Sequence, residues 1–190
     1  MRSTFIITAA AFVVLAGCNQ SDDGDALGNT AAASNQVLPI TDKDADAAKA
    51  TTAAMPTQPV PREQAGALMK QRHEDYEKIG DAMKVISREL KGDAPDLAAV
   101  RQNARISSGL APRIPGWFPP GTGPDVGKTE AKAEIWQKPE DFMAKSTAFT
   151  AAARAFDAAA QSTDLAAIRA AHGTMGKTCK ACHDLYREEH

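Results

Sequence analysis

Residues 165–186 read LAAIRAAHGTMGKTCKACHDLY. The larger side chains of this stretch recur at alternating steps of three and four residues, which places them on one face of an α-helix that packs against other helices. Ser162 or Thr163 can cap the start of this helix. We therefore predict a C-terminal helix whose inward face holds Leu165, Ile168, His172, Met175, Cys179, Cys182 and Tyr186.

The end of this helix contains Cys179-Lys180-Ala181-Cys182-His183, which has the Cys-x-x-Cys-His spacing of covalent haem attachment. On a helix these residues project to one side, so both thiols can reach one haem while the imidazole reaches its iron. A zinc site would need two further ligands, and a thioredoxin-like redox pair would need a preceding strand; the sequence offers neither. We expect one covalent haem c, held by Cys179 and Cys182, with His183 as the proximal iron ligand.

Three more helices are predicted before this one. The first covers residues 62–91, and Arg72 is the only charged residue on its apolar inward face. The second follows a capping region at Asp93 and Asp96 and ends near residues 108–109. The third begins at about Pro139, a favourable first helical residue, and continues to about residue 161.

The stretch from Ala111 to Gly127 holds five prolines and four glycines, so we expect a long crossover loop without regular structure. Four amphipathic helices and no strand candidate predict an all-α fold, an antiparallel four-helix bundle with a covalently bound haem. Aromatic residues make up only 5% of the chain, and alanine supplies much of its hydrophobic content. The haem is therefore expected to fill part of the interior.

The N-terminus reads MRSTFIITAAAFVVLAGC, with an early basic residue, an apolar run and small residues before Cys18. This pattern predicts a bacterial lipoprotein signal peptide over residues 1–17, with lipid attached to Cys18. The apolar run is shorter than the ~20 residues of a membrane-spanning helix. Residues 18–60 hold six aspartates and few large apolar side chains, so we expect a lipidated, disordered tether before a domain at residues 61–190.

These features predict a periplasmic protein that is anchored to a membrane by lipid. The outer membrane is favoured, because Asn19 stands where an aspartate typically retains lipoproteins at the inner membrane. A net charge of −2 provides no basic surface for nucleic acid, so we expect no nucleic-acid partner.

The iron position opposite His183 can hold a methionine or histidine in an electron carrier, or stay open in a gas-binding protein. Met69, Tyr76 and Met83 lie one heptad apart on the inward face of the first helix. Their spacing alone does not choose among them.

Four stretches together are similar to the cytochrome c′ family, the class II c-type cytochromes, and the similarity covers residues 61–190. They are Arg72-x-x-x-Tyr76-x-x-x-Gly80-x-x-Met83-Lys84, FPPGTG from Phe118, KTEAKAEIW from Lys128 and CKACHDLYR from Cys179. The resemblance implies that Tyr76 covers the open face of the haem and that Arg72 approaches its propionates. It also implies a proximal position for Arg187, where this residue would tune attack by nitric oxide.

The resemblance further implies five-coordinate, high-spin iron that binds NO or CO and is capable of one-electron redox chemistry. The alternative is a low-spin, six-coordinate electron carrier in which Met69 ligates iron and a periplasmic or membrane redox partner exchanges the electron. No distal general base is evident in the sequence, so we do not expect an enzyme. A homodimer through the first two helices is implied as well, although Lys78, Lys84 and Arg88 crowd the outer face of the first helix.

Overall fold

The computed structural model describes residues 52–189. The predicted signal peptide, Cys18 and most of the predicted tether lie outside these residues. Within them, no helix is long and apolar enough to cross a bilayer.

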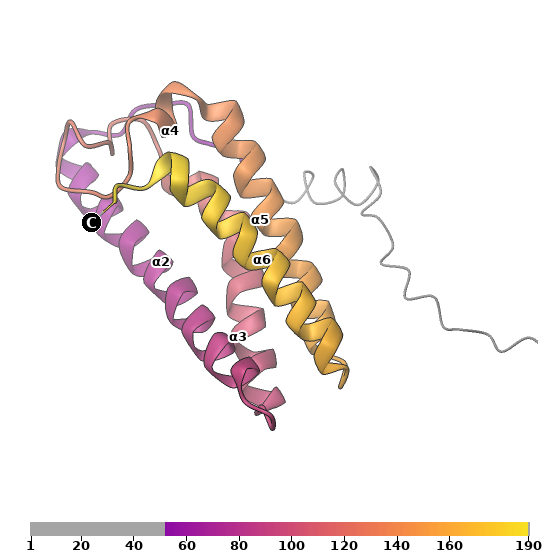
Figure 1. Ribbon diagram of the computed structural model, residues 1–190. Helices are drawn as coiled ribbons and strands as arrows, with labels where there is room; N and C mark the ends of the chain where they lie inside the picture. The colour runs from indigo at the N-terminus through magenta and orange to yellow at the C-terminus, as the bar shows by residue number, and fades with distance from the viewer. Residues whose placement is uncertain (1–51, 190) are drawn as a thin grey trace, which may run out of the picture. The chain divides into compact units, whose positions relative to one another are not determined.

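Four long helices build the described part of the chain (Figure 1): α2 (Arg62–Lys91), α3 (Leu97–Leu110), α5 (Pro139–Ala160) and α6 (Leu165–Tyr186). Helix α2 packs on α3, α3 on α5 and α5 on α6. Consecutive long helices run in opposite directions, and the described residues form no strand beyond one isolated bridge. The predicted all-α four-helix fold is confirmed.

Aspartates cap two of the helices. The side chain of Asp96 accepts hydrogen bonds from the backbone N–H groups of Ala98 and Ala99, as predicted for this region. At α6 the prediction of Ser162 or Thr163 was wrong, because Asp164 accepts the equivalent bonds from the first turn. Ser162 instead accepts a hydrogen bond from the backbone N–H of Asp164.

The connection between α3 and α5 is more regular than predicted. It contains a 3₁₀ helix, η1 (Ala111–Trp117), which continues directly from α3, and a short helix, α4 (Glu134–Gln137). Pro112 lies in the first turn of η1, where a missing N–H costs no helical hydrogen bond. The expectation of a wholly irregular loop from Ala111 to Gly127 was therefore wrong for its first seven residues.

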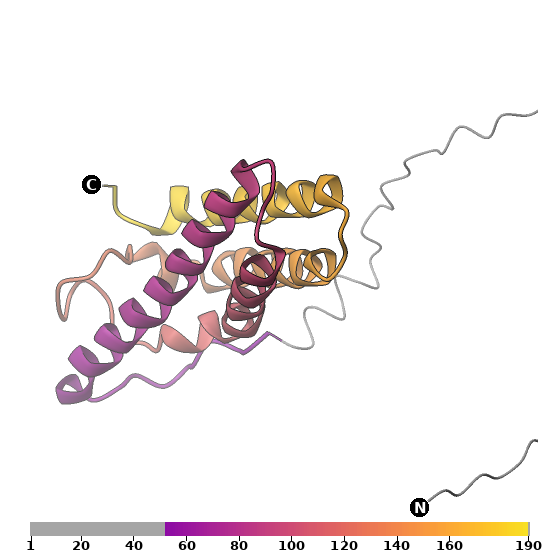
Figure 2. The same cartoon turned by 90° about the horizontal axis from the view of Figure 1, so that it is seen from below.

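Residues 53–60 form a segment that we call the N-terminal strap, which runs beside η1 to the start of α2 (Figure 2). The backbone N–H of Ala53 donates to Pro112 O at 2.7 Å, and that of Val60 donates to Pro120 O at 2.9 Å. Met55 packs against the hydrophobic core. The packed part of the chain therefore begins before Pro61, where the sequence placed the end of the disordered tether.

Gly121 permits this close approach of the strap to the loop. Its φ is +84°, and a Cβ at this position would lie 3.2 Å from Val60 O. A side chain is disfavoured both by this backbone conformation and by the neighbouring strap.

Helix α6 meets α2 at the end of the bundle where α2 stops. Ser87 Oγ and His172 Nε2 are 3.2 Å apart, and Arg169 donates from Nε to Leu90 O at 3.0 Å. The two helices are antiparallel. The residues that precede Ser87 in α2 and those that follow His172 in α6 therefore lie toward the same end of the bundle. The predicted haem-binding residues of α6 lie in that direction.

Candidate functional site

The Cys-x-x-Cys-His sequence lies in the last turns of α6. Cys179 and Cys182 are half-buried free thiols that pack against the hydrophobic core, whereas His183 is more exposed. Burial raises the pKa of Cys182 to about 11 and also raises the pKa of Cys179. Partial burial, followed by the neighbouring Arg187 guanidinium, lowers the pKa of His183. A lowered pKa favours the neutral imidazole, which is the form that ligates a metal.

Tyr76 lies on α2 and packs, like both thiols, against the hydrophobic core. Burial raises the pKa of its phenol, and the thiols of Cys182 and Cys179 raise it further, so the phenol lies within electrostatic reach of both. Its ring contacts Trp117 edge-on, with centroids 5.2 Å apart. Phe118 contacts the same ring at 6.2 Å. The loop after η1 therefore supplies an aromatic wall behind Tyr76.

Arg72, one turn before Tyr76, is 4% exposed. It donates to Thr122 Oγ1, Thr122 O and Thr129 Oγ1, each at 3.0 Å, and to Trp117 O at 3.4 Å. Its guanidinium carbon also lies 4.7 Å from the centre of the Phe118 ring. The FPPGTG and KTEAKAEIW stretches thus converge on Arg72, a contact that the sequence analysis did not predict.

The partners of Arg72 indicate the kind of group that this site suits. All four acceptors are neutral, and Arg72 takes part in none of the ion pairs formed among residues 52–189. Burial lowers its pKa to about 10. A buried cation surrounded by neutral acceptors is stabilised by a nearby carboxylate. Together with two thiols and an imidazole on the facing helix, this donor set fits a haem with its anionic propionates.

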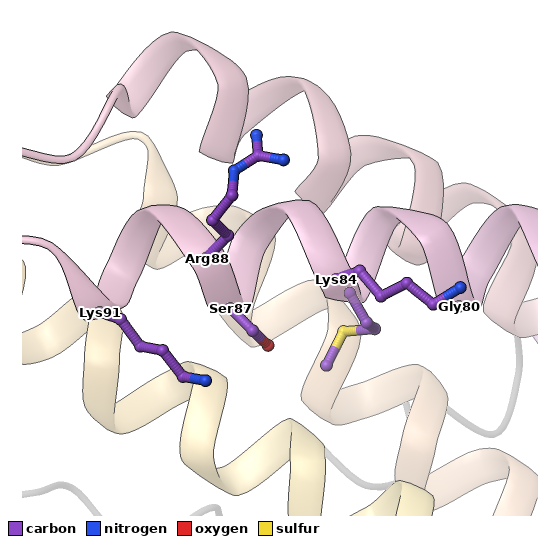
Figure 3. A pocket seen from close by; sticks show the side chains of 6 residues that line it. Gly80, Lys84, Ser87, Arg88 and Lys91 are labelled. Atoms are coloured by element: carbon purple, nitrogen blue, oxygen red, sulfur yellow. The ribbon is translucent and has the colours of Figure 1, made fainter.

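Met69 packs against the crossover loop. A Cβ on Gly127 would lie 3.5 Å from Met69 Sδ and 3.1 Å from its Cε, so the thioether packs against this glycine of the crossover loop. Met83 is half-buried and lines a shallow, open hollow of about 640 Å³. Figure 3 shows Ser87 and Lys91, which also line it, on the side of α2 that faces α6, and Arg88 on the other side.

Arg187 lies just past the end of α6. Its backbone is extended, with φ −113° and ψ 135°, and its side chain is half-exposed. It forms an ion pair with Glu130, with Arg187 Nη2 and Glu130 Oε2 2.8 Å apart. The structure therefore places Arg187 near His183 but bound to an acidic residue that the sequence analysis had not singled out.

Among the described residues, no group of three or more His, Cys, Asp or Glu side chains is arranged to hold a metal ion. Cys179, Cys182 and His183 lie in the last turns of α6, and Tyr76 of α2 lies within electrostatic reach of both thiols. Arg72 lies one turn before Tyr76, and Arg187 lies just past the end of α6. Thr122, Thr129 and Glu130 were missed, although all three belong to stretches that carried the family resemblance.

Comparison with known proteins gives a consistent result. The sequence profile described as Cytochrome C′ matches residues 67–187. The chain is 35% identical over 122 residues to a cytochrome c′ of Pararhodospirillum photometricum, which covers 64% of this chain and 97% of that protein.

Solved structures agree with this match. Cytochrome c prime from Shewanella frigidimarina superimposes with a TM-score of 0.61 and 36% identity, covering 67% of this chain and 98% of that one. A ferrous variant of cytochrome c prime from Alcaligenes xylosoxidans, solved with bound NO, gives a TM-score of 0.60 and 30% identity. The second alignment covers 70% of this chain and 100% of that one.

Proposed function

Because the chain belongs to the cytochrome c′ family, whose members carry a covalently attached c-type haem, we propose that Cys179 and Cys182 hold this haem and that His183 ligates its iron. The two thiols lie on one face of α6 and border the core, which supports this assignment. The lowered pKa of His183 favours the neutral imidazole that metal ligation requires.

We propose that the side of the iron facing α2 stays open and that Tyr76 covers it. Tyr76 lies near both thiols and is backed by Trp117. Met69, the ligand of the alternative hypothesis, packs against Gly127. The position of Tyr76 is the observation that carries the proposal, since a bulky phenol that keeps its proton can cover the iron without ligating it.

The bound haem supplies an iron centre that takes a diatomic ligand and changes oxidation state by one electron. The aromatic wall of Tyr76, Trp117 and Phe118 would keep water from its distal side and restrict the room for a ligand. Arg72, whose guanidinium is held by Thr122 and Thr129, would place its positive charge near the propionates. We therefore propose that the protein binds NO or CO rather than converting a substrate, in line with the NO-bound relative from Alcaligenes xylosoxidans.

Two exposed apolar side chains support the predicted homodimer. Leu68 on α2 and Ile106 on α3 are each 37% exposed, and they lie on the two helices that the dimer would use. Sedimentation velocity at several protein concentrations tests this proposal. A monomer at all concentrations would contradict it.

We further propose that the protein is exported to the periplasm and lipidated at Cys18. The support is the sequence of residues 1–18 and the need for c-type haem to be attached outside the bacterial cytoplasm. Metabolic labelling with a fatty acid tests the lipid: wild-type protein should be labelled and the Cys18→Ser variant should not. Label that persists in the variant would contradict lipidation at this residue.

The spin state of the purified holoprotein tests the proposed ligand-binding function. Absorption and electron paramagnetic resonance spectra should show high-spin, five-coordinate iron, and the ferrous protein should bind CO. Met69→Leu should leave the spectra unchanged. Low-spin iron that becomes high-spin in Met69→Leu would establish the alternative, an electron carrier with a methionine ligand.

A further inference from the structure

The segment before α4 is fixed to the end of α6 by its backbone. Glu188 N–H donates to Glu130 O at 2.8 Å, and Lys132 N–H donates to Tyr186 O at 3.0 Å. Ala131 and Arg187 form the isolated antiparallel bridge between them. Glu130 and Arg187, 57 residues apart in sequence, are therefore held side by side before their side chains interact.

The side chains then complete this contact. Arg187 donates from Nε to Glu130 Oε2 at 2.8 Å, and its Nη2 lies 2.8 Å from the same oxygen. The two side chains are 50% and 40% exposed. Such a pair at a surface is commonly weak, because both side chains lose conformational freedom. Here the backbone bridge already holds the two residues side by side, so pairing has only to order the two side chains.

This pair lies next to His183. Arg187 N–H donates to His183 O at 3.1 Å, so the arginine is tied to the last helical turn. The backbone bridge holds Glu130 beside Arg187, so both charged side chains lie at the end of this turn. The geometry therefore places one negative and one positive charge beside the helical turn that carries the proposed proximal ligand.

We propose that Glu130 is a positioning residue of the proximal side, whose carboxylate holds the Arg187 guanidinium beside His183 and balances its charge there. This inference rests on the proposed function, in which His183 ligates the iron. Reduction adds one electron to the iron, so a nearby carboxylate opposes it and a nearby guanidinium favours it. Each charge of the pair shifts the reduction potential in the opposite direction, and Glu130 also determines where the guanidinium lies.

The first experiment measures the midpoint potential of the holoprotein by titration with dithionite. Glu130→Gln should raise the potential, Arg187→Gln should lower it, and the double variant should return close to the wild-type value. Glu188→Gln is the matched control, because it removes the same charge one residue beyond Arg187. Its shift should be less than half that of Glu130→Gln. A Glu130→Gln shift that is downward, or no larger than that of the control, would overturn the electrostatic part of the inference.

The second experiment measures the ion pair itself in the holoprotein, by a readout other than the potential of the iron. Nuclear magnetic resonance of the Arg187 Nε–H group should show solvent exchange at least ~10-fold faster in Glu130→Gln, with little change in Glu188→Gln, because a hydrogen-bonded N–H is protected. Glu130→Asp, which keeps the charge, should restore part of the protection. Equal exchange in wild type and Glu130→Gln would overturn the positioning role.

The outcomes separate this inference from the proposed function. A wild-type protein with low-spin, six-coordinate iron would contradict the proposed function, while the Arg187 exchange measurement would still decide whether Glu130 holds Arg187. A wild type with high-spin, CO-binding iron whose potential and Arg187 exchange do not respond to Glu130→Gln would leave the proposed function intact and overturn only this inference.

Discussion

Tyr76 of α2 stands level with His183 of α6. The contact between Ser87 and His172 fixes the register of the two antiparallel helices, and both residues lie eleven positions from it, from 87 back to 76 and from 172 on to 183. Eleven helical residues span about 16 Å on each helix. Met69 lies two further turns along α2, beyond this level, which agrees with its packing against Gly127.

This register predicts that Tyr76 limits ligand binding on the side of the iron that faces α2. Tyr76→Ala removes the bulky ring, so CO affinity should rise at least ~10-fold, equivalent to about 1.4 kcal/mol. Equilibrium titration of the ferrous protein with CO measures the change. Met83→Ala, one heptad away on the same face, is the control and should change affinity much less. Unaltered affinity in Tyr76→Ala would show that this residue does not cover the iron.

The helices and the α6 site were predictable because both rest on local rules. The three-four spacing of apolar residues sets the helix faces, and Cys-x-x-Cys-His on a helix sets the side to which the thiols point. Nothing local could reveal that Arg72 would bond to Thr122, because that contact spans 50 residues and depends on how the crossover loop folds back. The pairing of Glu130 with Arg187 could not be predicted either, because these residues are 57 positions apart.

Two local details were also mispredicted. Ser162, Thr163 and Asp164 are all good capping residues, and only the start of α6 at Leu165 shows that Asp164 takes this role. In the crossover loop, five prolines suggested irregular structure, but proline satisfies the φ of a 3₁₀ helix and is tolerated in its first turn. The strap at residues 53–60 could not be recognised, because two backbone hydrogen bonds and one packed methionine leave no periodic pattern.

Arg72 should contribute to stability through its hydrogen bonds. Arg72→Met keeps much of the aliphatic volume but leaves the buried acceptors of Thr122 and the partly buried hydroxyl of Thr129 without their donor. We expect this loss to lower the free energy of unfolding by about 1–3 kcal/mol. Urea denaturation of the holoprotein measures this difference. Arg62→Met, at an exposed position in the first turn of α2, should change stability by less than about 0.5 kcal/mol. Equal effects of the two substitutions would refute a structural role for Arg72.

The same glycine substitution should have opposite effects at two positions. Gly121→Ala places a side chain at φ +84° against Val60 and should destabilise the protein by about 1–2 kcal/mol. Gly109→Ala, within α3 and with no atom near its would-be Cβ, should stabilise it by about 0.5–1 kcal/mol. Thermal unfolding followed by circular dichroism compares the two. Tolerance of Gly121→Ala would indicate that the strap does not hold the loop.

Tyr186 should make stability depend on alkaline pH. Its hydroxyl donates to Asp141 Oδ2 at 2.6 Å, and burial, followed by this bond, raises the phenol pKa above its ordinary value of 10.0. A raised folded-state pKa gives a stabilisation that is complete below pH 10 and is lost as the pH rises further. Tyr186→Phe should therefore be less stable than wild type below pH 10, and this loss of stability should become smaller above pH 10. We expect this loss of stability to be on the order of 1 kcal/mol at pH 8. A loss of the same size at about pH 11 would argue against this linkage.

The central claim is that α6 offers two thiols and one imidazole to a single haem. Mass spectrometry of peptides from the purified holoprotein tests it most directly. We predict that the peptide containing Cys179, Cys182 and His183 carries the mass of one haem bound at both cysteines, and that the variant with both cysteines changed to alanine carries none. Unmodified thiols at both positions in haem-containing protein, or haem retained covalently by the double variant, would contradict the account.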